Sequence, residues 1–313
     1  MFCTRWLWTI DYGPWTIPNC SYFCGQTKPE LDKEIIDPFI INALKEDVGD
    51  GDHTSLSTIA AGTKGKAKLL VKDEGILAGV ELAKEIFHIV DPHLKLNIRL
   101  NDGAKIKPGD IVLEIEGDAQ SILKAERLVL NCMQRMSGIA TKTHLVAEIL
   151  KDTHTRVLDT RKTTPGMRYL EKWAVRIGGG VNHRFGLYDM ILIKDNHVDY
   201  SGGIKQAIGN ARQYLIAQNK NLAIEIEVRN LGELEQVMLT GGVDRILLDN
   251  FNFSDLKKAV SIIGNKFITE ASGGITVDNI RDYAACGVDY ISVGALTHSV
   301  KSLDLSLKAE IDR

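Results

Sequence analysis

The sequence lacks the features that would place the protein in a membrane, on nucleic acid or outside the cell. No apolar run approaches the roughly 18–20 residues that a membrane-spanning helix needs. The net charge of −3 gives no global basic field for nucleic acid or an anionic membrane, so any basic site must be local. Cysteine is scarce, with five in 313 residues, and we therefore expect a protein of the reducing cytoplasm.

The rest of the composition is that of an ordinary globular protein. Hydrophobic residues make up 44% and charged residues 25% of the chain. A length of 313 residues fits one large domain or two ordinary ones. The chain is therefore long enough to bury a core of full size.

The first thirty residues differ in composition from the remainder. They contain three of the four tryptophans and three of the five cysteines. Asp11, Pro14 and Pro18 interrupt the apolar stretch that a signal peptide requires, so secretion is not expected. Cys20 and Cys24 resemble half a metal site, but no second Cys or His pair follows at zinc spacing. We predict that residues 1–30 are a poorly ordered extension or the result of a mis-assigned start.

The segment after this extension predicts a small α+β unit. Apolar residues recur at helical spacing from residue 35, and the helix is expected to end at the glycine-rich stretch 49–52. Residues 52–55 predict a turn and a helix cap, with His53 as a weak catalytic candidate. A long helical pattern covers 121–150, with an interruption expected near Gly138. The other predicted elements are strands at 66–72, 94–100 and 111–116 and a helix at 81–90.

From residue 156 onward, strand-like runs alternate with helical patterns, which predicts a parallel α/β sheet. The predicted strands are 156–160, 190–194, 223–228, 245–249, 267–271 and 290–294, and the clearest helices are 231–239, 254–262 and 277–286. An eight-stranded barrel takes about 250 residues, so the segment is too short for one. We predict an incomplete α/β barrel of six or seven strands, with an open doubly wound sheet as the alternative. In both folds the site lies at the carboxyl ends of the strands.

Every predicted strand end in this half carries polar residues or glycine, and these fall into three chemical groups. Arg161, Lys162, Arg184 and Lys194 supply positive charge suited to carboxylates or phosphates. Glu227 and Asp249 are acids on consecutive predicted strands. Acids placed beside phosphates usually hold Mg²⁺ or ribose hydroxyls. The backbone segments Ser272, Gly273, Gly274 and Gly294, Ala295 can approach an anion, each ahead of an expected helix N-terminus. The pattern predicts a site for a polyanionic, phosphate-bearing substrate.

Simpler interpretations stay open for several of these residues. Arg161 and Arg184 could form structural ion pairs with Glu227 and Asp249. Glycines at strand ends could serve only as turns, and residues 178–180 are expected to form a mobile loop. Periodicity alone makes Arg127 an exposed helix residue. A structural role is also open for the site candidates His183 and His197. Cys132 and Cys286 lie in apolar surroundings and are expected in the core.

Several motifs, in the same order along the chain, resemble those of the quinolinate phosphoribosyltransferase family, also called nicotinate-nucleotide pyrophosphorylase (carboxylating). They are DTRKTTPG at 159–166, GGVNHR at 179–184, IKDNH at 193–197, LDN at 248–250, SGGI at 272–275, EDVGDGD at 46–52 and ER at 126–127. The likeness runs from about residue 31 to the C-terminus. The resemblance implies an N-terminal open-faced sandwich packed on an incomplete α/β barrel, with the chain end returning to the first domain. It divides the chain into an extension (1–30), a sandwich domain (31–133 joined by 297–313) and a barrel with the active site (134–296).

The resemblance also implies a reaction and a role for each residue. Such enzymes join quinolinate to phosphoribosyl pyrophosphate with Mg²⁺ and release pyrophosphate and carbon dioxide, giving nicotinate mononucleotide for NAD biosynthesis. They are dimers, with a higher oligomer left open, and Arg127 would reach into the neighbour's site. Arg161, His183 and Arg184 would complete the clamp on quinolinate, and Thr160 would also bind substrate. Lys162 and Lys194 would bridge the two substrates. Glu227 and Asp249 would hold ribose hydroxyls or Mg²⁺, and the contact with Mg²⁺ could be direct or indirect. The glycine segments would bind the 5′-phosphate.

Three other functions remain as alternatives. A related phosphoribosyltransferase acting on nicotinate would need fewer cations, because nicotinate has one carboxylate. A Schiff-base lyase would use Lys194 at its strand end as the nucleophile. A non-catalytic phosphate-binding barrel would have no need of Glu227 and Asp249 beside the cations.

Overall fold

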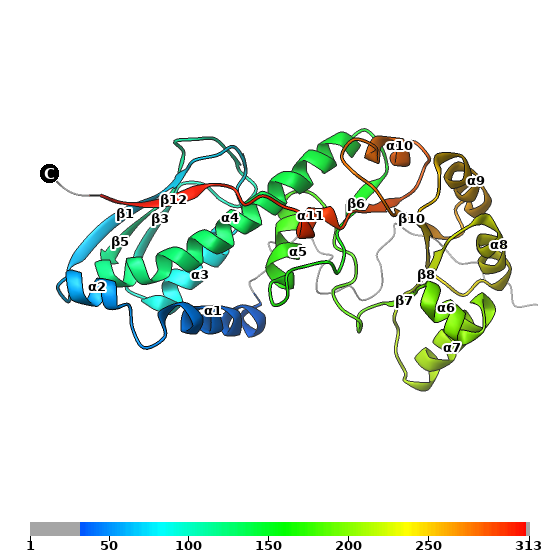
Figure 1. The fold of residues 1–313 in the computed structure, drawn as a ribbon, viewed down its shortest axis with the longest axis horizontal. Coiled ribbons are helices and arrows are strands. Elements are labelled where there is room, and N and C mark those ends of the chain that lie inside the picture. The colour runs from blue at the N-terminus through cyan, green and yellow to red at the C-terminus, as the bar shows by residue number, and fades with distance from the viewer. Residues whose placement is uncertain (1–31, 311–313) are drawn as a thin grey trace, which may run out of the picture.

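The structure is a computed structural model that describes residues 32–310, so the prediction for residues 1–30 lies outside the described part of the chain. Two units lie next to each other, an α+β unit and an α/β unit (Figure 1). Helix α4 (Ala119–Leu150) runs from the first unit into the second, and strand β12 (Leu305–Glu310) returns to the first. The predicted return of the chain end is confirmed.

The first unit is built on a four-stranded antiparallel sheet in the order β12-β1-β5-β3. Its strands alternate as a half-buried sheet requires: β1 (Lys64–Val71) buries Ala67, Leu69 and Val71 and turns the residues between them outward. The other elements of the unit are α1 (Lys33–Val48), α2 (His53–Thr58), β2 (Gly75–Ile76), α3 (Val80–Val90), β3 (Lys95–Ile98), β4 (Lys105–Ile106) and β5 (Ile111–Asp118). The predicted cap is present, since Asp52 Oδ1 accepts a hydrogen bond from Ser55 N at 3.0 Å.

One face of this sheet is covered and the other is not. Helices α1 and α3 and the first half of α4 lie against the covered face (Figure 1). The outer face carries side chains of both charges, including the pairs Lys66–Glu116 and Lys68–Glu114. Such a charged face is suited to solvent, and the predicted open-faced sandwich is confirmed.

Helix α4 is continuous, so the predicted interruption near Gly138 is wrong. Glycine is required there by packing. A Cβ atom at Gly138 would lie 2.3 Å from the carbonyl oxygen of Lys301, in the segment that returns to the first unit. The residues at which the two predicted domains would meet, 133 and 134, lie within this helix.

The second unit is a six-stranded parallel sheet in the order β6-β11-β10-β9-β8-β7. Its strands are β6 (Arg156–Leu158), β7 (Ile191–Ile193), β8 (Ile224–Val228), β9 (Arg245–Asp249), β10 (Ile268–Ser272) and β11 (Tyr290–Ser292). The first strand of the unit pairs with its last, as in a barrel, whereas a doubly wound sheet places its first strand internally. Among the described residues β6 and β7 are not paired with each other, so the barrel is open between them. Val181 forms a single parallel bridge to Leu158 of β6. The predicted incomplete barrel is confirmed.

Helices surround this sheet (Figure 1). They are α5 (Arg168–Ile177), α6 (Asp195–Ser201), α7 (Ile204–Ala217), α8 (Leu231–Thr240), α9 (Phe253–Ile263), α10 (Ile280–Ala284) and α11 (Ala295–His298). Residues 245–248 of β9 are all buried, as expected of a strand covered on both sides. Among the described helices, none is long and apolar enough to cross a lipid bilayer.

Candidate active site

The carboxyl end of β6 delivers the first two cations. Lys162 is exposed, and its side chain passes close to the neighbouring strand end, since a Cβ atom at Gly294 would lie 3.0 Å from Lys162 Cδ. Two hydroxyl groups fix the backbone here: Lys162 N donates to Thr160 Oγ1 at 3.1 Å, and Thr297 Oγ1 donates to the Lys162 carbonyl at 2.8 Å. The predicted neighbours Thr160, Lys162 and Gly294 are therefore together in space.

The segment after Val181 delivers the third cation, Arg184. Its Nη1 donates to the Met190 carbonyl at 3.0 Å. Burial first, and then the charge of Arg161, lower the pKa of Arg184, so the two guanidinium groups are close enough to repel each other. In the described part of the chain, Nε of Arg161 and of Arg184 is buried without a hydrogen-bond partner. Buried, unpaired guanidinium nitrogens are the donors that an anionic ligand would bind.

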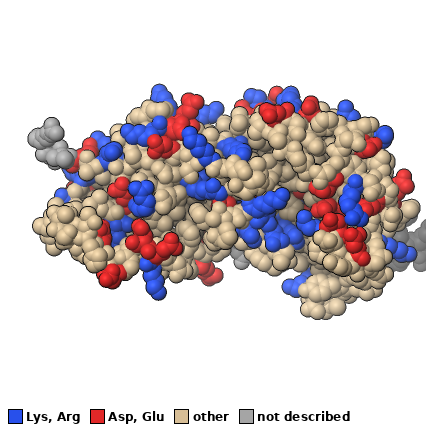
Figure 2. Space-filling model, in the orientation of Figure 1, with Lys and Arg blue, Asp and Glu red and all other residues tan. Residues whose placement is uncertain are grey.

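The structural ion pairs considered as an alternative do not form. Within residues 32–310, neither Arg161 nor Arg184 makes an ion pair with Glu227 or Asp249. Figure 2 shows Lys and Arg side chains gathered near the middle of the visible face, with Asp and Glu side chains beside them. Arg161 and Arg184 are thus left free for a ligand.

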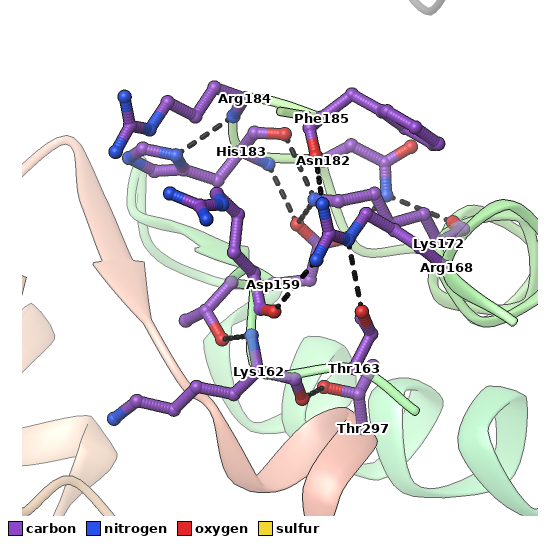
Figure 3. A network of polar contacts seen from close by, with 12 residues as sticks. Asp159, Lys162, Thr163, Arg168, Lys172, Asn182, His183, Arg184, Phe185 and Thr297 are labelled. Carbon is purple, nitrogen blue, oxygen red and sulfur yellow. Dashed lines mark hydrogen bonds and ion pairs between the residues drawn. The ribbon is translucent and has the colours of Figure 1, made fainter. Parts of the chain in front are cut away.

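His183 lies beside Arg184 (Figure 3), and both of its ring nitrogens have polar partners. Nε2 is 2.9 Å from Glu225 Oε2, and Nδ1 accepts from Arg184 N at 2.8 Å. Burial lowers the pKa of His183, and Glu270 and Glu225 raise it more, giving a net rise. The bond at Nδ1 opposes this rise in pKa, because Nδ1 must be unprotonated to accept the hydrogen bond from Arg184 N. The ring is therefore neutral, with its proton on Nε2. A contact with a substrate carboxylate would replace one of these bonds.

The acids lie on adjacent strands. Glu227 of β8 is 3.3 Å from Lys194 Nζ at the end of β7, and Asp249 ends β9. Burial raises the pKa of Glu227, Lys194 lowers it and Asp249 raises it, with a net rise. The charge of Asp249 disfavours the ionised form of Glu227, so the pair suits a cation or donor hydroxyls. The predicted pair, and the placement of Lys194 beside it, fit Mg²⁺ or ribose hydroxyls.

His197 has a structural role. It caps α6, because its Nδ1 accepts from Lys194 N at 3.0 Å. It therefore helps to orient the backbone that carries Lys194.

The glycine segments end the last two strands of the barrel, β10 and β11. Gly273 and Gly274 have φ values of +96° and +60°, and a Cβ atom at Gly273 would lie 2.2 Å from Asn250 Oδ1. Ser272 precedes them. Gly294 is the N-cap residue of the short helix α11, which begins at Ala295. The helix expected at 277–286 is shorter, since α10 spans Ile280–Ala284, but it still follows the glycine segment as predicted. Backbone N–H groups of the glycines would bind a phosphate here.

Arg127 lies apart from these strand ends. It is exposed on α4, and it makes no hydrogen bond or ion pair within the described part of the chain. Periodicity places it correctly on the surface of one chain. Its proposed reach into a neighbouring chain stays a prediction.

A buried polar network behind the cations was not predicted. Asp159 accepts from Lys172 Nζ and Asn182 Nδ2, both at 2.5 Å, and from His183 N at 2.8 Å (Figure 3). Next to Lys172, the fully buried Glu171 accepts from Arg135 Nη2 at 2.8 Å. The signal in the sequence is the pair Glu171–Lys172 within an otherwise apolar run, 170–175.

The glycine run 178–180 is packed against α4, so the prediction of a mobile loop is wrong. A Cβ atom at Gly178 would lie 2.4 Å from the Ala140 carbonyl oxygen, and one at Gly180 would lie 2.8 Å from Thr143 Cγ2. These glycines let α4 approach the segment that leads to Val181. Cys132 and Cys286 are buried, as predicted.

A cluster inside the barrel could be mistaken for a metal site. Polar atoms of His183, Glu225 and Glu270 lie within 4.8 Å of one another. Arg245 also belongs to the cluster, however, with Nη1 3.0 Å from Glu270 Oε2. Its guanidinium already supplies the positive charge that a metal ion would bring.

Family models and known proteins agree with this geometry. The model for the N-terminal domain of quinolinate phosphoribosyl transferase matches residues 52–137, and that for its C-terminal domain matches residues 139–308. A quinolinate phosphoribosyltransferase [decarboxylating] of Nicotiana tabacum is 45% identical over 285 residues, covering 86% of this chain and 81% of the relative. A probable nicotinate-nucleotide pyrophosphorylase [carboxylating] of Bacillus subtilis is 42% identical over 275 residues, covering 88% and 92%. The solved nicotinate-nucleotide pyrophosphorylase of Francisella tularensis is similar with a TM-score of 0.84 and 38% identity, covering 90% of this chain and 98% of that one. The chain therefore belongs to the quinolinate phosphoribosyltransferase family.

Proposed function

We propose that the chain transfers the phosphoribosyl group of phosphoribosyl pyrophosphate to quinolinate, with decarboxylation, for NAD biosynthesis. The products are nicotinate mononucleotide, pyrophosphate and carbon dioxide. The observation that carries the proposal is the cluster of Arg161, Lys162 and Arg184, which stands free of structural ion pairs beside a separate group of acids. Two substrate carboxylates and a phosphorylated donor need this much positive charge in one place.

Each part of the site has a task in this reaction. Arg161 and Arg184 hold the carboxylates of quinolinate, while Lys162 and Lys194 lie between the two substrates. The backbone at Ser272–Gly274 and Gly294 holds the 5′-phosphate. Glu227 and Asp249 hold ribose hydroxyls or Mg²⁺, and Mg²⁺ when bound neutralises the pyrophosphate.

No protein nucleophile is needed. The bond from the anomeric carbon to pyrophosphate breaks with oxocarbenium-like charge, and the ring nitrogen of quinolinate forms the new bond to that carbon. The nitrogen is then cationic, so its charge stabilises the electron pair left at C2 as carbon dioxide departs. A proton from water then forms the C2–H bond of nicotinate mononucleotide. The protein positions the reactants and supplies charge.

Two further parts of the proposal concern assembly and location. The exposed Arg127 would complete the quinolinate clamp of a second copy, which makes the protein a homodimer with sites at the interface. We keep the cytoplasm as the proposed location because cysteine is scarce. The names of two plant relatives include "mitochondrial" and "chloroplastic", so localisation is to be checked by imaging or fractionation.

The test is turnover with identified products. Purified protein, quinolinate, phosphoribosyl pyrophosphate and Mg²⁺ should give nicotinate mononucleotide by mass, and nicotinate should react far less. Equal turnover of the two acids would contradict the assignment to quinolinate. Trapping of a carbonyl substrate on Lys194 by borohydride would favour the lyase instead.

A further inference from the structure

Helix α5 sends two cationic side chains between the two segments that carry the quinolinate clamp. Arg168 and Lys172 are four residues apart, so they project from the same face of the helix. Figure 3 shows both side chains between segment 159–163, which carries Arg161 and Lys162, and segment 182–185, which carries His183 and Arg184. Neither cation is among the residues expected to bind substrate.

Each of the two cations binds both segments. Arg168 Nη1 donates to the Phe185 carbonyl at 3.1 Å, and its Nη2 donates to the Arg161 carbonyl at 3.4 Å. Lys172 Nζ donates to Asp159 Oδ1 at 2.5 Å and to the His183 carbonyl at 3.0 Å. Through α5, the Asp159 side chain and the Arg161 carbonyl are therefore joined to the backbone carbonyls on either side of Arg184.

Stability alone is a poor explanation for the deeper of these cations. Lys172 and Asp159 are both 0% exposed. Burial raises the pKa of Asp159 and lowers that of Lys172, and the contact between the two groups opposes both shifts. Asn182 Nδ2 and His183 N also donate to the carboxylate. A well-packed apolar pair is often at least as stabilising as a buried ion pair, because desolvation offsets most of the attraction. Such a pair does, however, fix a geometry that apolar contacts would not.

We propose that Arg168 and Lys172 are positioning residues that set the distance between the two cation-bearing segments and so make the site selective for a ring with two adjacent carboxylates. The proposal rests on the proposed function, in which these segments hold quinolinate. A substrate with one carboxylate needs only one segment in place. A substrate with two carboxylates needs both segments in place, at one fixed distance from each other.

The experiment uses the full-length protein and the variants Arg168→Met and Lys172→Met. Dissociation constants for quinolinate and for nicotinate are measured by calorimetry or by competition. We expect the quinolinate constant to rise at least about tenfold, because small misplacements of binding groups are costly. The nicotinate constant should change less, so the preference for quinolinate falls. A general loss of folded protein would change both constants together.

A double variant separates positioning from charge compensation. Lys172→Met alone leaves Asp159 buried without its partner, so its melting temperature should fall. Adding Asp159→Asn removes the second charge, and the melting temperature should recover. Quinolinate binding should stay weak, because the bond to the His183 carbonyl is still missing. If quinolinate affinity recovered together with the melting temperature, Lys172 would only compensate a charge and the positioning role would be overturned.

The control is Lys258→Met on α9, which makes the same replacement at an exposed lysine paired with Asp255. It should leave both dissociation constants and the melting temperature unchanged. If Lys172→Met does not fold, Arg168→Met and the double variant still carry the test. Wild-type quinolinate affinity in these variants would overturn the positioning role while the proposed function stands. Failure of the wild-type protein to turn over quinolinate would instead contradict the proposed function.

Discussion

Replacing Arg127 by alanine tests whether two chains share one site. Arg127 is exposed and without a polar partner in the described part of the chain, so its removal should change the free energy of unfolding by at most about 0.5 kcal/mol. Arg135, eight residues later on α4, contacts Glu171 and the Thr297 carbonyl beside the barrel. Arg127 therefore lies about 12 Å further along the helix from its own barrel than Arg135 does.

The expected loss appears in binding. If Arg127 donates a charge-assisted bond to a quinolinate carboxylate, its removal costs about 1.5–3 kcal/mol of binding free energy. That corresponds to roughly a 10- to 150-fold weaker affinity. Calorimetry measures the affinity, while size-exclusion chromatography and thermal unfolding check that the variant keeps the oligomeric state and the fold of the wild type.

Mixing variants shows which chain supplies the residue. Lys162→Ala removes a cation of the barrel site, and Arg127→Ala removes the cation on α4. In a mixed dimer with shared sites, one site has both residues intact. Activity should return after subunit exchange, up to about one quarter of wild type, because half the dimers are mixed and each has one good site. Confirmed exchange without any return of activity would refute the shared site.

Three other changes have expected outcomes. Chelation by EDTA should abolish turnover and added Mg²⁺ should restore it; full activity in EDTA would remove Mg²⁺ from the mechanism. Gly178→Ala should lower the free energy of unfolding by about 1–3 kcal/mol in denaturant titration, because the new methyl group meets the Ala140 carbonyl at 2.4 Å. The exposed Gly264, with nothing near its Cβ position but a φ of +57°, gives a comparison in which only backbone strain acts. A chain that begins at Leu31 should keep near-normal melting temperature and activity; a large loss of either would show that the extension packs on the body.

The strands of the barrel could be predicted because each is a short apolar run that ends in polar residues. The predicted strand 245–249 coincides with β9, and 223–228 differs from β8 by one residue. Their polar ends could then be placed together, since parallel strands bring their carboxyl ends to one edge. Local sequence was sufficient for this part of the site.

The glycines could not be interpreted correctly in the same way. Gly138 and Gly178 resemble helix breaks or loop residues when only their neighbours in sequence are considered. Their actual constraint is the approach of distant backbone, Lys301 in one case and Ala140 in the other. The sequence holds no signal for which remote segment lies over a glycine.

The buried charges were missed for a related reason. Periodicity sorts residues into apolar and polar positions, so Glu171 and Lys172 would be placed on the surface of a helix. Both are fully buried, and each has its own partner. Glu171 pairs with Arg135 of α4, and Lys172 pairs with Asp159. Only the tertiary structure shows that the partners of these charges are also buried.

The arrangement of charge explains why such a scaffold is needed. Arg161 and Arg184 repel each other, which is the second cause of the lowered pKa of Arg184, and neither Nε has a hydrogen-bond partner among the described residues. Side chains on a flexible backbone would relax apart or turn toward Glu227 and Asp249. The bonds from Asp159, Arg168 and Lys172 hold the backbone instead, so the cations stay together before any substrate arrives. Preorganised charge of this kind binds an anion without first having to be assembled, which is the condition for strong electrostatic catalysis.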